Sequence, residues 1–168
     1  MIDPSYVQMM ARYNAWQNAQ LAESLDGVSQ EVLNEDRGAF FGSIHGTLNH
    51  ILWGDRAWMH RLNPDFPAPD ADVQHTQCTP TIAVWRDERL DMDHQISAWA
   101  DALPAAFLSG IVTWRSYLLQ KDFNHAADMC VMHLFNHQTH HRGQVHAMMT
   151  AAGLQAPVSD IPFMPGEE

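Results

Sequence analysis

Residues 133–145 read HLFNHQTHHRGQV, and histidines recur in this run at positions 133, 137 and 141. A helix turns by about 100° per residue, so histidines four residues apart lie on one stripe of a helix. Their Cβ atoms are then about 5–6 Å apart, and two imidazoles at that separation can both reach one metal ion at about 2.0–2.1 Å. The spacing therefore predicts that His137 and His141 bind one metal from the same helix face.

This run lies in the last of four helices that the sequence predicts, which cover residues 4–25, 41–62, 80–102 and 125–152. Apolar residues recur at approximately helical spacing in the first three, and Gly153 follows the fourth as a typical helix end. Four helices with short or moderate connections favour an all-α fold, an antiparallel four-helix bundle. The length, 168 residues without an internal repeat, predicts one domain over residues 1–168.

The expected helix ends depend on a few local signals. Ser43 is a candidate N-terminal cap of the second helix, which Pro64 helps to stop. Thr79 is the expected cap of the third helix, with Pro80 in its first position, a place that suits proline.

The remaining segments are predicted to be connections. Residues 28–39 are polar, residues 64–80 are rich in proline and aspartate, and the tail at 154–168 is expected to be extended. Residues 111–114, Ile-Val-Thr-Trp, have the composition of a strand. We therefore predict a short extended or hairpin piece before the last long helix.

Composition and charge exclude several classes of protein. The net charge of -11 argues against binding to nucleic acid, which requires clustered lysine and arginine. No run of about 18 uncharged apolar residues is present, so no membrane span is expected. The chain begins without a basic region followed by an apolar run, and its two cysteines fit no paired spacing. We therefore expect a protein of the reducing cytoplasm.

A third metal ligand has to come from another element, and His50 on the second predicted helix is the best candidate. Spacing alone does not show that His50 points toward His137 and His141. One histidine pair four residues apart more often lies on the surface or in the core without binding a metal. Because five histidines fall at positions 133–146, the explanation that they bind no metal is weaker here. The residues alone leave both interpretations open.

The other histidines of the run have weaker claims to a functional role. His133 extends the stripe and is expected to be buried and hydrogen-bonded rather than to contact the metal. His140 lies near the same face and is either a base in the pocket or uninvolved. His146 lies roughly opposite His137 and is expected to have no role.

Some residues near the ligands are expected to support them. Three amides are either hydrogen-bond partners of the ligand rings or exposed polar residues: Asn49, Asn136 and Gln138. We expect Arg142 to form an ion pair and Gly143 to let a neighbouring helix approach. Most of the tryptophans are expected in the core, with Trp53 as the best candidate for a pocket wall, and Tyr13 is a weaker candidate to reach the site.

The 133–145 run resembles the signature of the DinB/YfiT-like family of metal-dependent proteins. Further segments resemble that family in the same order along the chain: Tyr13-Asn14-Ala15-Trp16, Leu48-Asn49-His50-Ile51-Leu52, and Gly153 followed by Asp160-Ile161-Pro162. The resemblance implies a four-helix bundle, often dimeric, with three histidine ligands. These ligands correspond to His50, His137 and His141.

Three neutral imidazoles leave the metal a position for substrate. The ligand set suits one divalent transition metal but does not choose among Zn, Ni, Cu and Fe(II). We expect zinc or nickel, with iron and manganese as further candidates. The resemblance implies thiol-dependent transferases and isomerases, so we expect a metal-dependent transferase or hydrolase acting on a small molecule, with a low-molecular-weight thiol as partner. The alternative is a non-enzymatic metal-binding module of the stress response. A di-iron carboxylate site is disfavoured because it needs Glu-x-x-His motifs, and only Asp91–His94 and Asp122–His125 come close.

Overall fold

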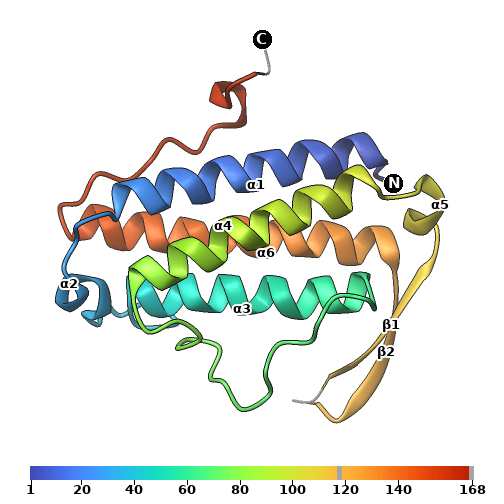
Figure 1. The fold of residues 1–168 in the computed structure, drawn as a ribbon, viewed down its shortest axis with the longest axis horizontal. Helices are drawn as coiled ribbons and strands as arrows, with labels where there is room; N and C mark the ends of the chain where they lie inside the picture. Colours follow the sequence, from blue (N-terminus) through green and yellow to red (C-terminus); the bar gives the residue numbers. More distant parts are fainter. Residues whose placement is uncertain (117–118, 167–168) are drawn as a thin grey trace.

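Four long helices form most of the computed structural model, which describes residues 1–116 and 119–166. They are α1 (Pro4–Ser24), α3 (Ile44–Leu62), α4 (Ile82–Asp101) and α6 (Ala127–Ala151). Helix α1 contacts both α4 and α6, and α3 contacts the same two helices (Figure 1). Each long helix therefore has two long neighbours, and their inner faces enclose a common core.

Besides its helices the chain contains a small sheet, at the place where the sequence predicts a short extended or hairpin piece in an otherwise all-α fold. Strands β1 (Ile111–Ser116) and β2 (Lys121–Ala126) pair antiparallel, with Ile111 opposite Ala126 and Ser116 opposite Lys121. The predicted extended piece before the last helix is thereby confirmed, and its β-branched and aromatic residues explain it. The chain is mostly helical with a two-stranded hairpin that leads directly into α6 (Figure 1).

Three short helices complete the described elements: α2 (Gln30–Asn34), α5 (Ala105–Leu108) and the 3-10 helix η1 (Ile161–Phe163). Helix α2 interrupts a segment that was expected to be only a connection. Its N-terminal cap is Ser29, whose side chain accepts a hydrogen bond from the backbone of Val32.

The helix ends differ from the predicted ones where tertiary contacts compete for the capping residue. Ser43 caps α3 as predicted. The cap of α4 is Thr81 rather than Thr79. Thr79 is buried instead, and both its backbone N–H and its hydroxyl donate to Asn49 Oδ1, at 2.9 and 2.7 Å. Helix α6 starts at Ala127 rather than at 125 because the preceding residues pair with β1.

The core combines apolar side chains with a buried polar network. Its largest fully buried apolar side chains on the long helices come from α3, α4 and α6 and include Leu48, Ile51, Trp85, Ile96, Leu134 and Phe135, and α1 adds the fully buried Val7. Most of the expected tryptophans do line this core, Trp85 fully and Trp16, Trp58 and Trp99 in part. Burial of this apolar surface supplies the main driving force for folding.

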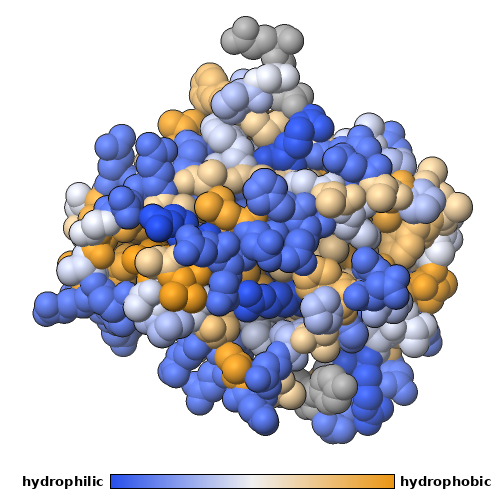
Figure 2. All heavy atoms as spheres, in the orientation of Figure 1, coloured by the Kyte–Doolittle hydropathy of each residue, from blue (hydrophilic) through white to orange (hydrophobic). Residues whose placement is uncertain are grey.

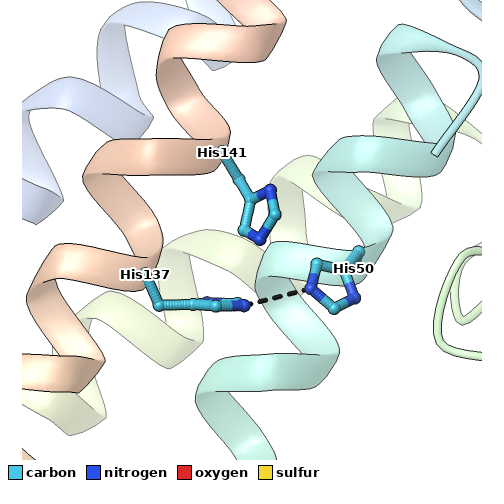
Figure 3. A group of neighbouring side chains, drawn as sticks. All are labelled: His50, His137 and His141. Carbon is cyan, nitrogen blue, oxygen red and sulfur yellow. Dashed lines mark hydrogen bonds between the residues drawn. The ribbon is translucent and has the colours of Figure 1, made fainter. Parts of the chain in front are cut away.

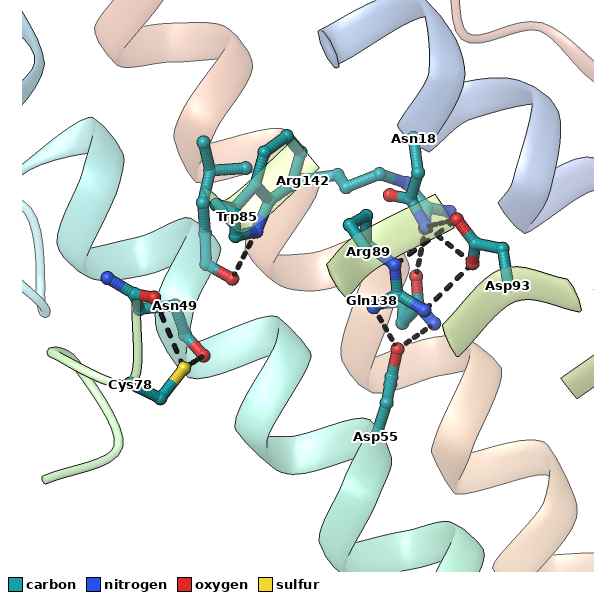
Figure 4. A network of polar contacts seen from close by, with 10 residues as sticks. Asn18, Asn49, Asp55, Cys78, Trp85, Arg89, Asp93, Gln138 and Arg142 are labelled. Carbon is teal, nitrogen blue, oxygen red and sulfur yellow. Dashed lines mark hydrogen bonds and ion pairs between the residues drawn. The ribbon is translucent and has the colours of Figure 1, made fainter. Parts of the chain in front are cut away.

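The polar network is centred on Arg89, which is fully buried (Figure 4). Its guanidinium donates to Asp55 Oδ2 at 2.5 Å and to Asp93 Oδ1 at 2.8 Å. Asn18 donates to Asp93, and the amide of Gln138 donates to Asp55 Oδ2 at 2.6 Å. The network therefore joins all four long helices and fixes their relative positions at the level of Gln138, which adjoins His137 in sequence.

The outer surface is largely hydrophilic on the face that Figure 2 shows, with hydrophobic side chains in small separate patches. Within the described part of the chain, none of the helices combines the length and the apolar character needed to cross a membrane.

Candidate metal centre

Three histidine rings meet between α3 and α6 (Figure 3). His50 extends from α3, and His137 and His141 extend from α6. One ring nitrogen of each lies within 4.8 Å of the others, and the Nε2 atoms of His50 and His137 are 3.0 Å apart. Ligand nitrogens of a tetrahedral metal at about 2.1 Å lie roughly 3.4 Å from one another. The three rings therefore need only small movements to surround one ion.

The helical spacing and one glycine bring the rings together. His137 and His141 are one helical turn apart, so both face α3. On the opposite side Gly54 is buried against His137, and a Cβ placed on Gly54 would lie 2.8 Å from His137 Cε1. Real Cβ contacts are not that short, so only glycine at position 54 lets the His137 ring lie where it does.

The environment keeps these rings neutral, as metal ligation requires. The pKa of His50 is lowered to about 3, first by burial and then by the neighbouring His137, His141 and His75. The pKa of His137 is also lowered to about 3, again mainly by burial. Burial lowers the pKa of His141 as well. Each neutral ring offers one lone pair, and a cation at the centre would meet no charged imidazole.

The outer ring nitrogens show how two of the rings are oriented. His50 Nδ1 lies 3.0 Å from Nδ1 of His75, and His141 Nδ1 lies 2.9 Å from Oε1 of Gln144. Because Gln144 Oε1 can only accept, His141 carries its proton on Nδ1, which leaves Nε2 free as a ligand. His137 Nδ1 is buried without a hydrogen-bond partner among the described residues.

One side of the centre is covered by an aromatic ring. Phe41, in the segment before α3, stacks on His50 with ring centroids 3.9 Å apart and lies 5.2 Å from the ring of His141. His75 closes the adjacent side, with its centroid 5.5 Å from that of Phe41. Phe41 and His75 therefore shield part of the centre from water.

Sequence reasoning did not find His75, Gln144 or Phe41. Gln144 carried a usable signal, because it lies three residues after His141 on the same helix. His75 and Phe41 carried none, because they belong to segments outside the helices, whose paths follow no periodic pattern.

For Asn49, Asn136 and Gln138 the sequence left open either a bond to a ligand ring or an exposed position, and the first alternative is not found among the described residues. Asn49 accepts from Thr79 and Cys78 instead, and its own amide donates to the backbone carbonyls of Thr76 and Thr79. Gln138 is buried in the Arg89 network, and Asn136 is exposed. None of the three bonds to a ligand ring in the described part of the chain. Their distance from the rings follows from packing, which sequence spacing does not encode.

The expectation for His133 is wrong, since the residue is exposed rather than buried, and its ring lies tilted against that of Trp58 with ring centroids 4.6 Å apart. His146 is exposed on α6, away from the three rings, as expected. His140 is also exposed, and its ring lies 4.8 Å from that of His141. It is thus close enough to the centre to remain a candidate base.

The expectations for Arg142, Gly143 and Tyr13 are wrong as well. Arg142 forms no ion pair within the described residues, because its guanidinium donates to Gln138 Oε1 at 2.6 Å and lies over the ring of Tyr13. Gly143 is exposed with nothing near its Cβ position, so the close approach occurs at Gly54 instead. The hydroxyl of Tyr13 donates to the backbone of Ser159 and so holds the C-terminal segment rather than reaching the site.

Comparisons with known proteins agree with this description. A family model described as "DinB family" matches residues 1–167. The fold is similar to the crystal structure of a DinB-like protein from Bacillus cereus, with a TM-score of 0.65 and 18% sequence identity, over 87% of this chain and 90% of that one. A search of curated proteins gave no match. At this identity the likeness to the Bacillus protein concerns the fold alone.

Proposed function

The chain belongs to the DinB family, and from this premise we propose that His50, His137 and His141 bind one divalent transition metal that serves a reaction of a small molecule. One observation carries the proposal: three neutral imidazoles from two helices present nitrogens within 4.8 Å of one another. The group contains no carboxylate, which distinguishes it from a di-iron centre. Three imidazoles suit several divalent transition metals, and we propose zinc or nickel, with iron and manganese as further candidates.

The surrounding residues support a site with room for a substrate. Three protein ligands leave a coordination position, and a metal bound there would supply Lewis acidity, either to polarise a carbonyl group or to hold a thiolate. His75 and Gln144 orient two of the rings, and Phe41 excludes water from one side. His140, next to His141, is positioned to accept or donate a proton at the rim. We therefore propose a metal-dependent transferase or hydrolase, with a low-molecular-weight thiol as the expected partner.

Metal analysis tests the binding step. We expect untagged protein, purified without chelator, to contain close to one transition metal per chain and the His137→Ala variant to contain almost none. The matched control is His94→Ala, because His94 is an exposed histidine on α4. Circular dichroism of each variant establishes that the fold is retained. Wild-type protein that stays empty after incubation with zinc, nickel, manganese and iron(II) would overturn the proposal.

A separate assay tests the reaction. Metal-loaded protein is incubated with a small thiol and a panel of electrophiles, and product formation is compared with that of chelator-treated protein. Turnover that depends on the metal supports a transferase. A loaded protein that turns over none of the thiol or ester substrates would favour the alternative, a metal-binding module without catalysis.

A further inference from the structure

A cavity separate from the three histidines lies beside the C-terminal half of α3, where the β1–β2 hairpin and the loop between α3 and α4 flank the helix (Figure 1). Its volume is about 480 Å³, within the range of small-molecule sites. Its walls are mainly alanine, proline and tryptophan, among them Ala57, Pro69, Trp53 and Trp114. The cavity is therefore shaped for an apolar body.

The main charged group in this wall is Arg61. Its guanidinium carbon lies 4.5 Å from the ring centre of Trp58 and 4.1 Å from that of Trp114. The two indoles also contact each other, with ring centroids 5.6 Å apart, so the guanidinium packs against both rings at their junction and its freedom to turn is reduced. Among the described residues, no carboxylate, carbonyl or amide accepts a hydrogen bond from Arg61, and the side chain lines the cavity, so its donors are available to a ligand.

Most arginines in the described part of the chain do have a carboxylate partner, and Arg142, which has none, donates to the amide oxygen of Gln138. Acidic residues outnumber lysine and arginine by 20 to 9. Arg115, the second arginine of the cavity wall, pairs with Asp122 at 3.0 Å, and Arg56 pairs with Glu88 at 2.8 Å. Arg61 packs against two tryptophans and has no carboxylate partner among the described residues, so it can bind an external anion.

We propose that this cavity binds a small organic carboxylate with an aromatic or branched aliphatic body, its carboxylate on Arg61 and its body against the apolar wall. A guanidinium matches a carboxylate through two parallel hydrogen bonds, and the neighbouring indoles strengthen them by excluding water. The apolar lining favours such a ligand over a small inorganic anion, because a small anion would leave the apolar side chains of the lining exposed to water.

The cavity is distinct from the three histidines. Arg61 follows His50 by eleven residues on α3, an axial rise of about 16 Å. Trp53 connects the two regions, because it lines the cavity and its ring lies 5.8 Å from that of His75. Carboxylate binding at Arg61 therefore needs no metal, and failure of the metal proposal would leave this one intact.

The test titrates 3-phenylpropionate into chelator-treated wild-type protein and follows tryptophan fluorescence and calorimetric heat. Three probes serve as comparisons: 3-phenylpropionamide, which lacks the charge, and acetate and inorganic phosphate, which lack the apolar body. We expect the carboxylate to bind at least about tenfold more tightly than its amide and than either small anion. Equal affinity for acid and amide would overturn the proposal, and so would a lack of any binding at 10 mM.

Two variants separate ligand binding from a structural role. Arg61→Gln should lose the preference for acid over amide, and Arg61→Lys should retain part of it through its charge. Arg115→Gln is the matched control, because Arg115 lines the same cavity but is paired with Asp122. If Arg61 only fastened the hairpin to α3, Arg61→Gln would lower stability without changing acid–amide selectivity, and that result would refute the proposal.

Discussion

Gly54 of α3 and His137 of α6 are in such close contact that a Cβ at position 54 would lie 2.8 Å from His137 Cε1. The contact sets the distance between the helix that carries His50 and the helix that carries the other two histidines. It also makes the geometry of the metal centre sensitive to a single methyl group.

The first prediction follows from this contact. In Gly54→Ala the ring of His137 has to move, so metal affinity should fall by about 10–100-fold. The free energy of unfolding of the metal-free protein should change by no more than about 1 kcal/mol, because a ring tip moves more easily than backbone and alanine favours the helix. Zinc titration and urea unfolding measure the two quantities. Gly143→Ala is the control: with nothing near its Cβ position, affinity should be unchanged.

The second prediction concerns His75, which contacts the outer nitrogen of His50. Removing this partner in His75→Ala should weaken metal binding by about 10–100-fold, because a ligand ring without its outer hydrogen bond is less well oriented. Stability without metal should stay the same, since His75 is exposed. Competition with a chromophoric chelator gives the affinity, with His94→Ala as the control. An unchanged metal affinity would show that His75 does not contribute to the orientation of the His50 ring.

The third prediction concerns the buried network. Arg89→Met would leave Asp55 and Asp93 in the core without their cation, so we expect a loss of about 3–5 kcal/mol in the free energy of unfolding. Arg86→Met is the matched control on the same helix, because Arg86 pairs with Asp26 at the surface and should contribute less than about 1 kcal/mol. Urea denaturation at neutral pH measures both, and a similar small effect of the two changes would contradict the prediction.

The fourth prediction concerns pH and His45, a buried histidine away from the three rings. Burial lowers its pKa below the usual 6.5, and its ring nitrogens contact Gln30, Asn34 and Thr79, none of them charged. The unfolded chain therefore binds a proton at His45 more readily than the folded protein does. Its contribution to stability is present above about pH 6.5 and is lost as the pH falls toward the lower folded pKa.

Urea unfolding of wild type and His45→Gln between pH 8 and pH 5 tests this sign. Because other buried histidines also contribute to acid sensitivity, only the difference between the two proteins reports His45. The wild type should lose more stability than the variant as the pH is lowered. Parallel curves would show that His45 titrates alike in both states.

Much of the fold was predictable because it depends on local geometry. The helical repeat placed His137 and His141 on one face, the hydroxyl of Ser43 marked the start of α3, and the β-branched run from Ile111 marked a strand. Each of these follows from residues only a few positions apart. The cap of α4 was mispredicted for the opposite reason, since Thr79 is bonded to the distant Asn49.

The sequence by itself determined that a helix presents two histidines as a pair and that three further long helices accompany it. Only the tertiary structure decided that the ring of His50 turns toward that pair, that Gly54 rather than Gly143 allows the close approach, and that His75 and Phe41 complete the surroundings. The physical reason is that periodicity fixes which face a side chain occupies. The partner of that face depends on how helices distant in sequence pack around a shared core and its buried ion pairs.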